Sequence, residues 1–219
     1  MKKNSLVLAM AIVGLLTMNF RCEKDVVVRP FDYTFEIPVA IYPLKKTYSL
    51  NDTIWLETDL SGKTLYDNKT RQNILVDSGM ITLCTSFNAF GTSITNPANG
   101  FSEVTSTSGN NISRDLGHWG TVGYLNDFGC GQTSYRCRIG FKPNYKGNFY
   151  LSLPQEGLLG SCTNKVVPYY ASTAYKFKNV DLNKDVFDAL SKNDKGGNDG
   201  VKFYTDKIAK REVFVFKVE

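Results

Sequence analysis

The sequence has few of the side chains on which hydrolytic chemistry usually depends. Its 219 residues include a single histidine, His118. A serine nucleophile needs a histidine or lysine base that a third group orients, and the Gly-x-Ser-x-Gly turn of many hydrolases is absent. Cys-x-x-Cys pairs, which mark many zinc sites, are absent as well. We therefore expect no enzyme, no metal and no other cofactor.

The chain also has only a small excess of positive over negative charge. The formal net charge of the whole chain is +5. Lys2, Lys3 and Arg21 supply three of the positive charges, and without residues 1–21 the charge falls to +2. A nucleic-acid-binding protein needs a basic stripe that can neutralise phosphates. The weak charge therefore argues against a nucleic-acid partner.

No long apolar run follows the positively charged start of the chain. Residues 6–16 are apolar or small, but a helix that crosses a bilayer needs about 20 such residues. A positive start followed by a short apolar segment is typical of a secretory signal peptide. Small residues suited to ordinary cleavage are missing near residue 20, whereas Cys22 lies at the distance expected of a lipidated cysteine.

These features divide the chain into three predicted parts. Residues 1–21 form the signal peptide, and residues 22–30 form a tether that begins with the lipidated Cys22. Residues 31–219 form one folded domain of a size that can bury a substantial core. Acyl chains on Cys22 would attach this domain to a membrane.

Alternating apolar residues predict that the domain is all-β. Residues 31–41 place every second, apolar residue on one face, a strong strand signal. Pro38 lies on the opposite face and cannot donate to a neighbouring strand, so we expect this strand to lie at an edge or to break there. Across the chain the pattern predicts seven to nine strands in an immunoglobulin-like β-sandwich. The alternating residues are Phe31, Tyr33, Phe35, Ile37, Val39 and Ile41.

The C-terminal part of the chain predicts a short helix and a central strand. Asn183 is placed to cap a helix that continues to Ser191, and residues 193–200 are expected to form a flexible turn. Residues 212–218 are apolar on both faces until Lys217. A strand of this kind is more often central than peripheral.

Four cysteines remain when Cys22 is set aside, and an even number in an exported chain predicts two disulfides. Residues 134–153 read as a hairpin centred near Asn144 and Tyr145. Reflection through that centre brings Cys130 close to Cys162, which favours a Cys130–Cys162 bond. Elimination then leaves Cys84–Cys137. The alternative for Cys137 is a buried thiol, because it alternates with Ile139 and Phe141.

Residues 88–132 differ from the rest in being rich in Gly, Ser, Thr and Asn. A loop of that length without structure is unusual. The segment therefore either contains short strands near 102–107 and 121–125 or forms a functional surface loop. In the second case its large side chains would contact a ligand such as a glycan. The candidate contacts are Trp119, His118, Phe101 and Tyr124.

The chain resembles the small exported lipoproteins of Bacteroidetes. The resemblance rests on the signal, on Cys22 with the Glu-Lys-Asp that follows, and on residues 48–55, which resemble the opening of an immunoglobulin-like strand. Asn19 and Arg21 stand where that group usually has Leu and a small residue. The resemblance implies a lipoprotein of the outer membrane, on its surface or its periplasmic face.

Together these observations predict a non-enzymatic lipoprotein of the cell envelope that acts by binding or assembly. Its partners would be the membrane, through the lipid, and a glycan or an envelope protein. One alternative is an accessory protein that binds glycans with the 88–132 loop. Another is an adhesin or assembly subunit that exchanges its terminal strand, residues 212–218, between chains.

Overall fold

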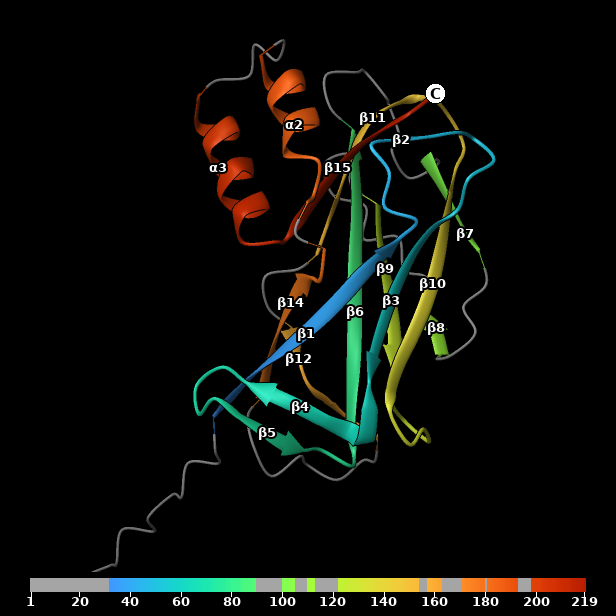
Figure 1. Cartoon of the computed structure of the whole chain (residues 1–219). Helices are drawn as coiled ribbons and strands as arrows, with labels where there is room; N and C mark the ends of the chain where they lie inside the picture. The colour runs from blue at the N-terminus through green and yellow to red at the C-terminus, as the bar shows by residue number, and fades with distance from the viewer. Residues whose placement is uncertain are drawn as a thin grey trace, which may run out of the picture. The chain divides into compact units, whose positions relative to one another are not determined.

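Two β-sheets build the described part of the chain in the computed structural model (Figure 1). These residues belong to one compact unit, Phe31–Glu219. The predicted signal peptide and the whole tether, with Cys22, lie outside the described residues. The structure describes residues 32–89, 100–104, 110–112, 122–153, 157–162, 171–179, 181–192 and 198–219.

The first sheet contains eight of the described strands. Most neighbours are antiparallel, but β1 and β14 run parallel. A 3-10 turn, η1 (Ser61–Lys63), joins β3 to β4. In spatial order the strands are β12 (Gly157–Leu158), β14 (Ala171–Phe177), β1 (Tyr33–Tyr42), β3 (Ile54–Leu60), β10 (Tyr135–Pro143) and β7 (Phe101–Val104), with β4 (Thr64–Asp67) on β1 and β5 (Gln72–Leu75) on β4.

The second sheet contains the other seven described strands. Its long strands are antiparallel, and the two-residue β2 runs parallel to the end of β15. In spatial order the strands are β2 (Thr47–Tyr48), β15 (Val213–Val218), β11 (Gly147–Ser152), β6 (Gly79–Ala89), β9 (Val122–Phe128) and β8 (Asn110–Ile112), with β13 (Gly160–Ser161) on β6.

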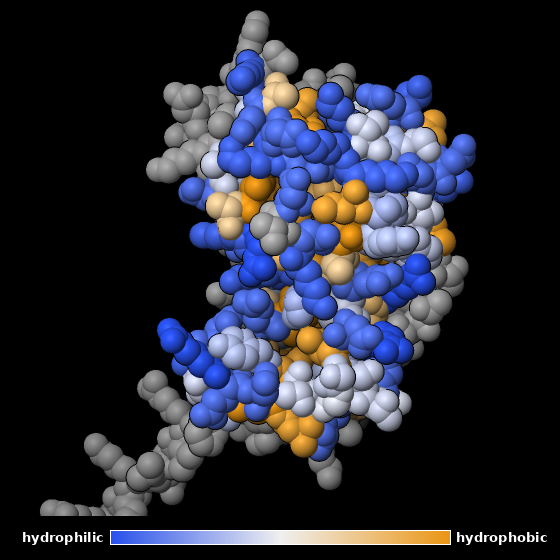
Figure 2. Space-filling view, in the orientation of Figure 1, coloured by the Kyte–Doolittle hydropathy of each residue, from blue (hydrophilic) through white to orange (hydrophobic). Residues whose placement is uncertain are grey.

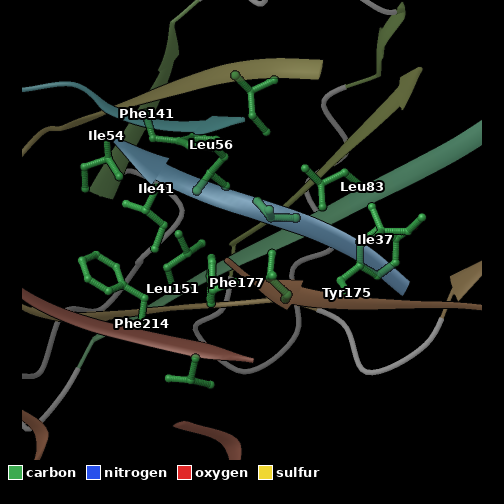
Figure 3. Close-up of a cluster of buried hydrophobic side chains, with 14 of the residues drawn as sticks. Ile37, Ile41, Ile54, Leu56, Leu83, Phe141, Leu151, Tyr175, Phe177 and Phe214 are labelled. Atoms are coloured by element: carbon green, nitrogen blue, oxygen red, sulfur yellow. The ribbon is translucent and has the colours of Figure 1, made fainter. Parts of the chain in front are cut away.

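Aromatic and aliphatic side chains from both sheets fill one core (Figure 3). The rings of Phe177 in the first sheet and Phe214 in the second have centroids 6.5 Å apart. Phe87 and Phe141 meet across the sandwich at 4.8 Å. These contacts confirm the predicted all-β sandwich of two sheets. The sequence predicts seven to nine strands, and eight described strands have six residues or more, with seven shorter ones in addition.

The alternation in β1 is confirmed, but its predicted place at an edge is wrong. Phe35, Ile37 and Val39 are completely buried, and β1 pairs on both sides. On one side it lies along β14, and on the other its partner changes from β4 to β3. Pro38 lies between these two partners, where the missing N–H breaks neither of the two pairings.

The terminal strand β15 is central, as predicted. β11 pairs along its whole length, and β2 pairs with its last two residues. Val213, Phe214, Val215 and Phe216 are all completely buried. One face of β15 points into the core and the helices cover the other, which explains why the strand is apolar on both faces.

Two helices, rather than the one predicted, precede β15. The helices α2 (Lys184–Ser191) and α3 (Asn198–Ala209) lie beside each other and contact β15 (Figure 1). The predicted flexible turn at 193–200 is therefore wrong from Asn198 onwards, where α3 begins. In α2 the side chains of Val186 and Phe187 are buried, as the sequence pattern indicates.

Asn183 precedes α2 but does not cap it as predicted. Its backbone is left-handed, with φ of 60°, and its side chain forms no capping hydrogen bond. The Nδ2 amide instead donates to the carbonyl oxygens of Lys45, at 2.9 Å, and Val215, at 2.7 Å. Asparagine tolerates this backbone conformation better than most residues. The buried amide therefore fastens the start of α2 to β15.

The predicted hairpin at 134–153 is wrong, because its two arms belong to different sheets. The strand β10 pairs with β3 and β7, whereas β11 pairs with β15 and β6. Residues 144–146 thus carry the chain from one sheet to the other. An arch between sheets and a hairpin have the same local turn signals, and only the choice of partner strands distinguishes them.

The structure contains the favoured disulfide, Cys130–Cys162, with Cα atoms 5.3 Å apart. The pairing is right although the hairpin that suggested it is not, because both half-cystines lie at one end of the second sheet, after β9 and β13. The second predicted bond is wrong, since Cys84 and Cys137 are both free. Cys137 points into the core, whereas Cys84 alternates with the core-facing residues of β6. The alternative, a buried Cys137 thiol, is therefore correct.

Candidate functional site

A polar pocket lies where α3 meets the outer face of the second sheet. Its volume is about 230 Å³. Residues from β6 and β11 form its floor, α3 contributes two residues to its wall, and Val213 begins β15 beside it. We call this recess the α3 pocket. It is lined by Ser86, Asn88, Tyr150, Ser152, Tyr204, Lys207 and Val213.

The strand register explains why the floor is polar. Ser86 is paired with Ser152, and Asn88 is paired with Tyr150, across β6 and β11. These residues alternate with core residues such as Phe87 and Leu151. Polar side chains that alternate with buried ones must point away from the core. The floor is thus the outward-facing half of a regular antiparallel ladder.

Two hydroxyl pairs lie in the α3 pocket. The Oγ atoms of Ser86 and Ser152 are 2.5 Å apart, and so are the phenol oxygens of Tyr150 and Tyr204. Each hydroxyl has one proton to donate and lone pairs that accept. One proton suffices for each shared bond, so a pair keeps both donor and acceptor character.

Tyr150 and Tyr204 join the floor to the wall. Their ring centroids are 4.8 Å apart and their planes are inclined at 58°. Burial, followed by the hydrogen bond to Tyr204, raises the pKa of Tyr150 above its ordinary value. The phenol of Tyr150 therefore remains protonated at neutral pH and acts as a hydrogen-bonding group rather than as a base.

Lys207 brings a positive charge to the wall, and Glu212 lies next to it. The Nζ–Oε2 distance is 3.9 Å, and the two side chains are only 15% and 11% exposed. The two opposite charges leave this part of the pocket close to neutral. The described lining contains no histidine, cysteine, aspartate or glutamate.

The predicted ligand contacts do not come together at this site. Phe101 is buried in the core and stacks on Phe87 with centroids 4.1 Å apart, so its prediction as a ligand contact is wrong. Tyr124 belongs to β9, opposite Thr85, and its side chain lies outside the described part. Trp119 and His118 also lie outside it. The segment 88–132 contains β7, β8 and β9, in agreement with the first of the two alternatives for this region.

Sequence reasoning missed the residues of the α3 pocket. The signal for α3 was available, because Val201, Tyr204 and Ile208 recur at the spacing of a helical face. The glycines at 196, 197 and 200 obscured it and suggested a turn. Nothing in the sequence could show that α3 packs beside β6 and β11, since the three segments are far apart in the chain.

The outer face of the first sheet carries charged side chains instead. Arg138 and Glu57 form a cross-strand ion pair at 2.9 Å, and Arg136 and Asp59 form another at 2.8 Å. The guanidinium of Arg138 also lies over the ring of Trp55, 4.4 Å from its centroid. Hydrophilic residues cover most of the face seen in Figure 2.

Among the described residues, no three histidine, cysteine or carboxylate side chains gather as they would around a metal ion. The described helices are also too short, or too polar, to cross a membrane.

Comparison with known proteins yields only distant structural similarity. Neither a protein-family model nor a curated protein matches the chain. A type II cohesin dyad from the adaptor ScaA scaffoldin of Acetivibrio cellulolyticus is similar over 66% of this chain, with 11% identity and a TM-score of 0.31. The similar part spans 47% of that dyad. A chain of a type I cohesin–dockerin complex from Clostridium thermocellum is similar over 65% of this chain and 99% of its own length, with 13% identity and a TM-score of 0.23. At these scores neither structure bears on function.

Proposed function

We propose that this protein is a non-enzymatic lipoprotein of the bacterial cell envelope that acts by binding a small polar group in the α3 pocket. Acyl chains on Cys22 would hold it on the outer membrane, at the surface or on the periplasmic face. The β-sandwich would serve as the rigid support for the pocket.

The observation that carries this proposal is the composition of the α3 pocket. Its described lining offers hydroxyls, an amide and an ammonium group but no pair of carboxylates and no histidine. Such groups orient a ligand by hydrogen bonding. Glycosidase chemistry, by contrast, usually needs two carboxylates on either side of the scissile bond.

Two features support a place in the cell envelope. The chain begins with a signal-like segment that is followed by Cys22. The Cys130–Cys162 bond fits an oxidising compartment, because cytosolic reductants keep most thiols free.

The two alternative functions have less support. Exchange of the terminal strand would have to break the pairing of β15 with β11 along its whole length. Glycan binding by the 88–132 loop has one candidate contact fewer, because Phe101 is buried in the core. The α3 pocket is therefore the better candidate for a binding site.

Mass spectrometry of the membrane-extracted protein tests the location. We expect the first residue to be Cys22 carrying acyl chains, and we expect Cys22→Ser to release the protein from the membrane fraction. Recovery of the intact chain from the cytosol, with Met1 in place, would contradict the proposal.

Turnover assays test the claim that the protein is no enzyme. Purified protein should not hydrolyse glycans, esters or peptides. Turnover that Lys207→Ala or Ser86→Ala abolishes would show that the α3 pocket is catalytic instead.

A further inference from the structure

We infer that the ligand of the α3 pocket is one unit of a neutral saccharide. The inference rests on the proposed function and names the class of ligand for the same site. Three features of the pocket carry it: its paired hydroxyls, its tyrosine wall and its balanced charge.

The floor of the pocket matches a ligand with several hydroxyls. Ser86 and Ser152 share one hydrogen bond, which leaves a second hydroxyl proton and further lone pairs at the same point of the floor. A sugar ring also presents donors and acceptors in alternation along its edge. Each of its hydroxyls can therefore both give and receive a hydrogen bond here.

The wall of the pocket matches the apolar face of a sugar ring. Tyr204 is half-buried and presents an apolar ring and a polar hydroxyl. Its hydroxyl is held by Tyr150, so the ring has a fixed position beside the floor. The C–H groups on one face of a pyranose can pack on such a ring while its hydroxyls reach the floor.

The charge of the pocket selects against an anionic ligand. Glu212 lies 3.9 Å from Lys207, and both side chains are mostly buried. A phosphate or carboxylate ligand would therefore meet an ammonium group whose charge Glu212 already balances. A neutral ligand does not need that charge and can still accept a hydrogen bond from Lys207.

The size of the pocket limits the ligand to one ring. Sites for drug-sized molecules have volumes of about 300–1,000 Å³, whereas this pocket has about 230 Å³. A single sugar unit, free or within a longer chain, fits that scale better than a folded peptide or a nucleotide.

Isothermal titration calorimetry tests the inference with the full-length chain in a detergent that has no sugar headgroup. The probes are tetrasaccharides of glucose, galactose, mannose or N-acetylglucosamine. We expect at least one of them to bind. Ser86→Ala with Ser152→Ala should weaken that binding about tenfold, because two hydrogen bonds are lost. Tyr204→Ala should weaken it as well, and Tyr204→Phe, which keeps the ring, should weaken it less.

Two matched variants serve as controls. Ser172→Ala removes a hydroxyl that pairs with Thr34 in the first sheet, 3.2 Å away and outside the pocket. Tyr66→Ala removes an exposed tyrosine from β4. Both should bind the tetrasaccharide as the unchanged protein does. A melting curve for every variant separates loss of binding from loss of folding.

The outcomes separate this inference from the proposed function. The inference that the ligand is a saccharide is overturned if none of the four tetrasaccharides gives heat. It is also overturned if the pocket variants leave the binding unchanged. A parallel thermal-shift series uses amino acids, dipeptides and nucleosides. If one of these compounds raises the melting temperature through the α3 pocket and no sugar does, the saccharide inference is wrong but the proposed binding function stands. No response to any of these classes overturns both.

Discussion

The outer faces of the two sheets differ in how much of each is exposed to water. On the first sheet, Arg138–Glu57 and Arg136–Asp59 lie across neighbouring strands with about half of each side chain exposed. On the second sheet, helices cover Val213 and Val215, and uncharged hydroxyls follow beside them. A charged ladder leaves a solvated surface. A partly covered sheet leaves a step, and a recess forms at that step.

The largest effect should come from opening the end of the second sheet. Cys130→Ser with Cys162→Ser removes the bond that closes a loop with a sequence separation of 32. We expect the free energy of unfolding to fall by about 3–4 kcal/mol, because the unfolded chain gains freedom. Urea denaturation with and without reductant measures this loss. A fall below 1 kcal/mol would mean that the bond is dispensable.

The comparison between the faces can be tested directly with one strand residue from each face. Val215 is completely buried on the helix-covered face, so Val215→Ala should lower the free energy of unfolding by about 2 kcal/mol. Glu57→Ala on the charged face should lower it by about 0.5 kcal/mol or less, because exposed ion pairs contribute little. Urea denaturation of both variants gives the contrast. Equal losses would show that the charged face is as important to stability as the covered one.

Acid sensitivity should be concentrated in the first sheet, at the turn between β4 and β5. Burial disfavours the Asp67 carboxylate, but hydrogen bonds from Thr70, at 2.6 and 2.7 Å, and from the N–H of Thr34, at 2.7 Å, outweigh it and lower its pKa. The contribution of Asp67 to the free energy of unfolding is therefore complete at pH values above the usual carboxyl pKa of about 4. It is lost as the pH falls through the lower pKa that Asp67 has in the folded protein.

Asp67→Asn keeps the shape of the side chain but loses these charge-assisted bonds. We expect a loss of about 2 kcal/mol at pH 7, and a smaller difference from the unchanged protein at pH values below about 4. Denaturation at a series of pH values measures it. A difference that stays constant with pH would contradict the assignment to Asp67.

The last prediction concerns the close approach of Gly140 to the Trp55 ring on the charged face. A Cβ atom added at Gly140 would lie 2.8 Å from the ring of Trp55, which is its cross-strand partner. Gly140→Ala should therefore cost about 1 kcal/mol through overpacking. In a Trp55→Ala background the cost should be smaller but not zero, because the added Cβ would still lie 2.9 Å from Cγ2 of Thr53. A cost that is equal in both backgrounds would rule out the ring as the cause.

The sequence predicted best where one segment alone carries the signal. The alternation in β1 and the doubly apolar β15 are local patterns, and both appear in the structure as expected. The change of sheet at 144–146 left no local trace, because Asn144 and Gly147 suit a hairpin as well as an arch. The α3 pocket could not be predicted, because Ser86, Ser152 and Tyr204 come from three distant segments that only the fold brings together.

The parallel pairing of β1 with β14 has a consequence for the order in which the protein can fold. Thr34 meets Ser172 at a sequence separation of 138. Contacts between such distant residues form slowly, because a long loop must close first. The first sheet cannot be completed until β14, which ends at Phe177, has been synthesised, and β15 comes later still. A nascent chain therefore stays open for most of its synthesis, as the proposed export across a membrane requires.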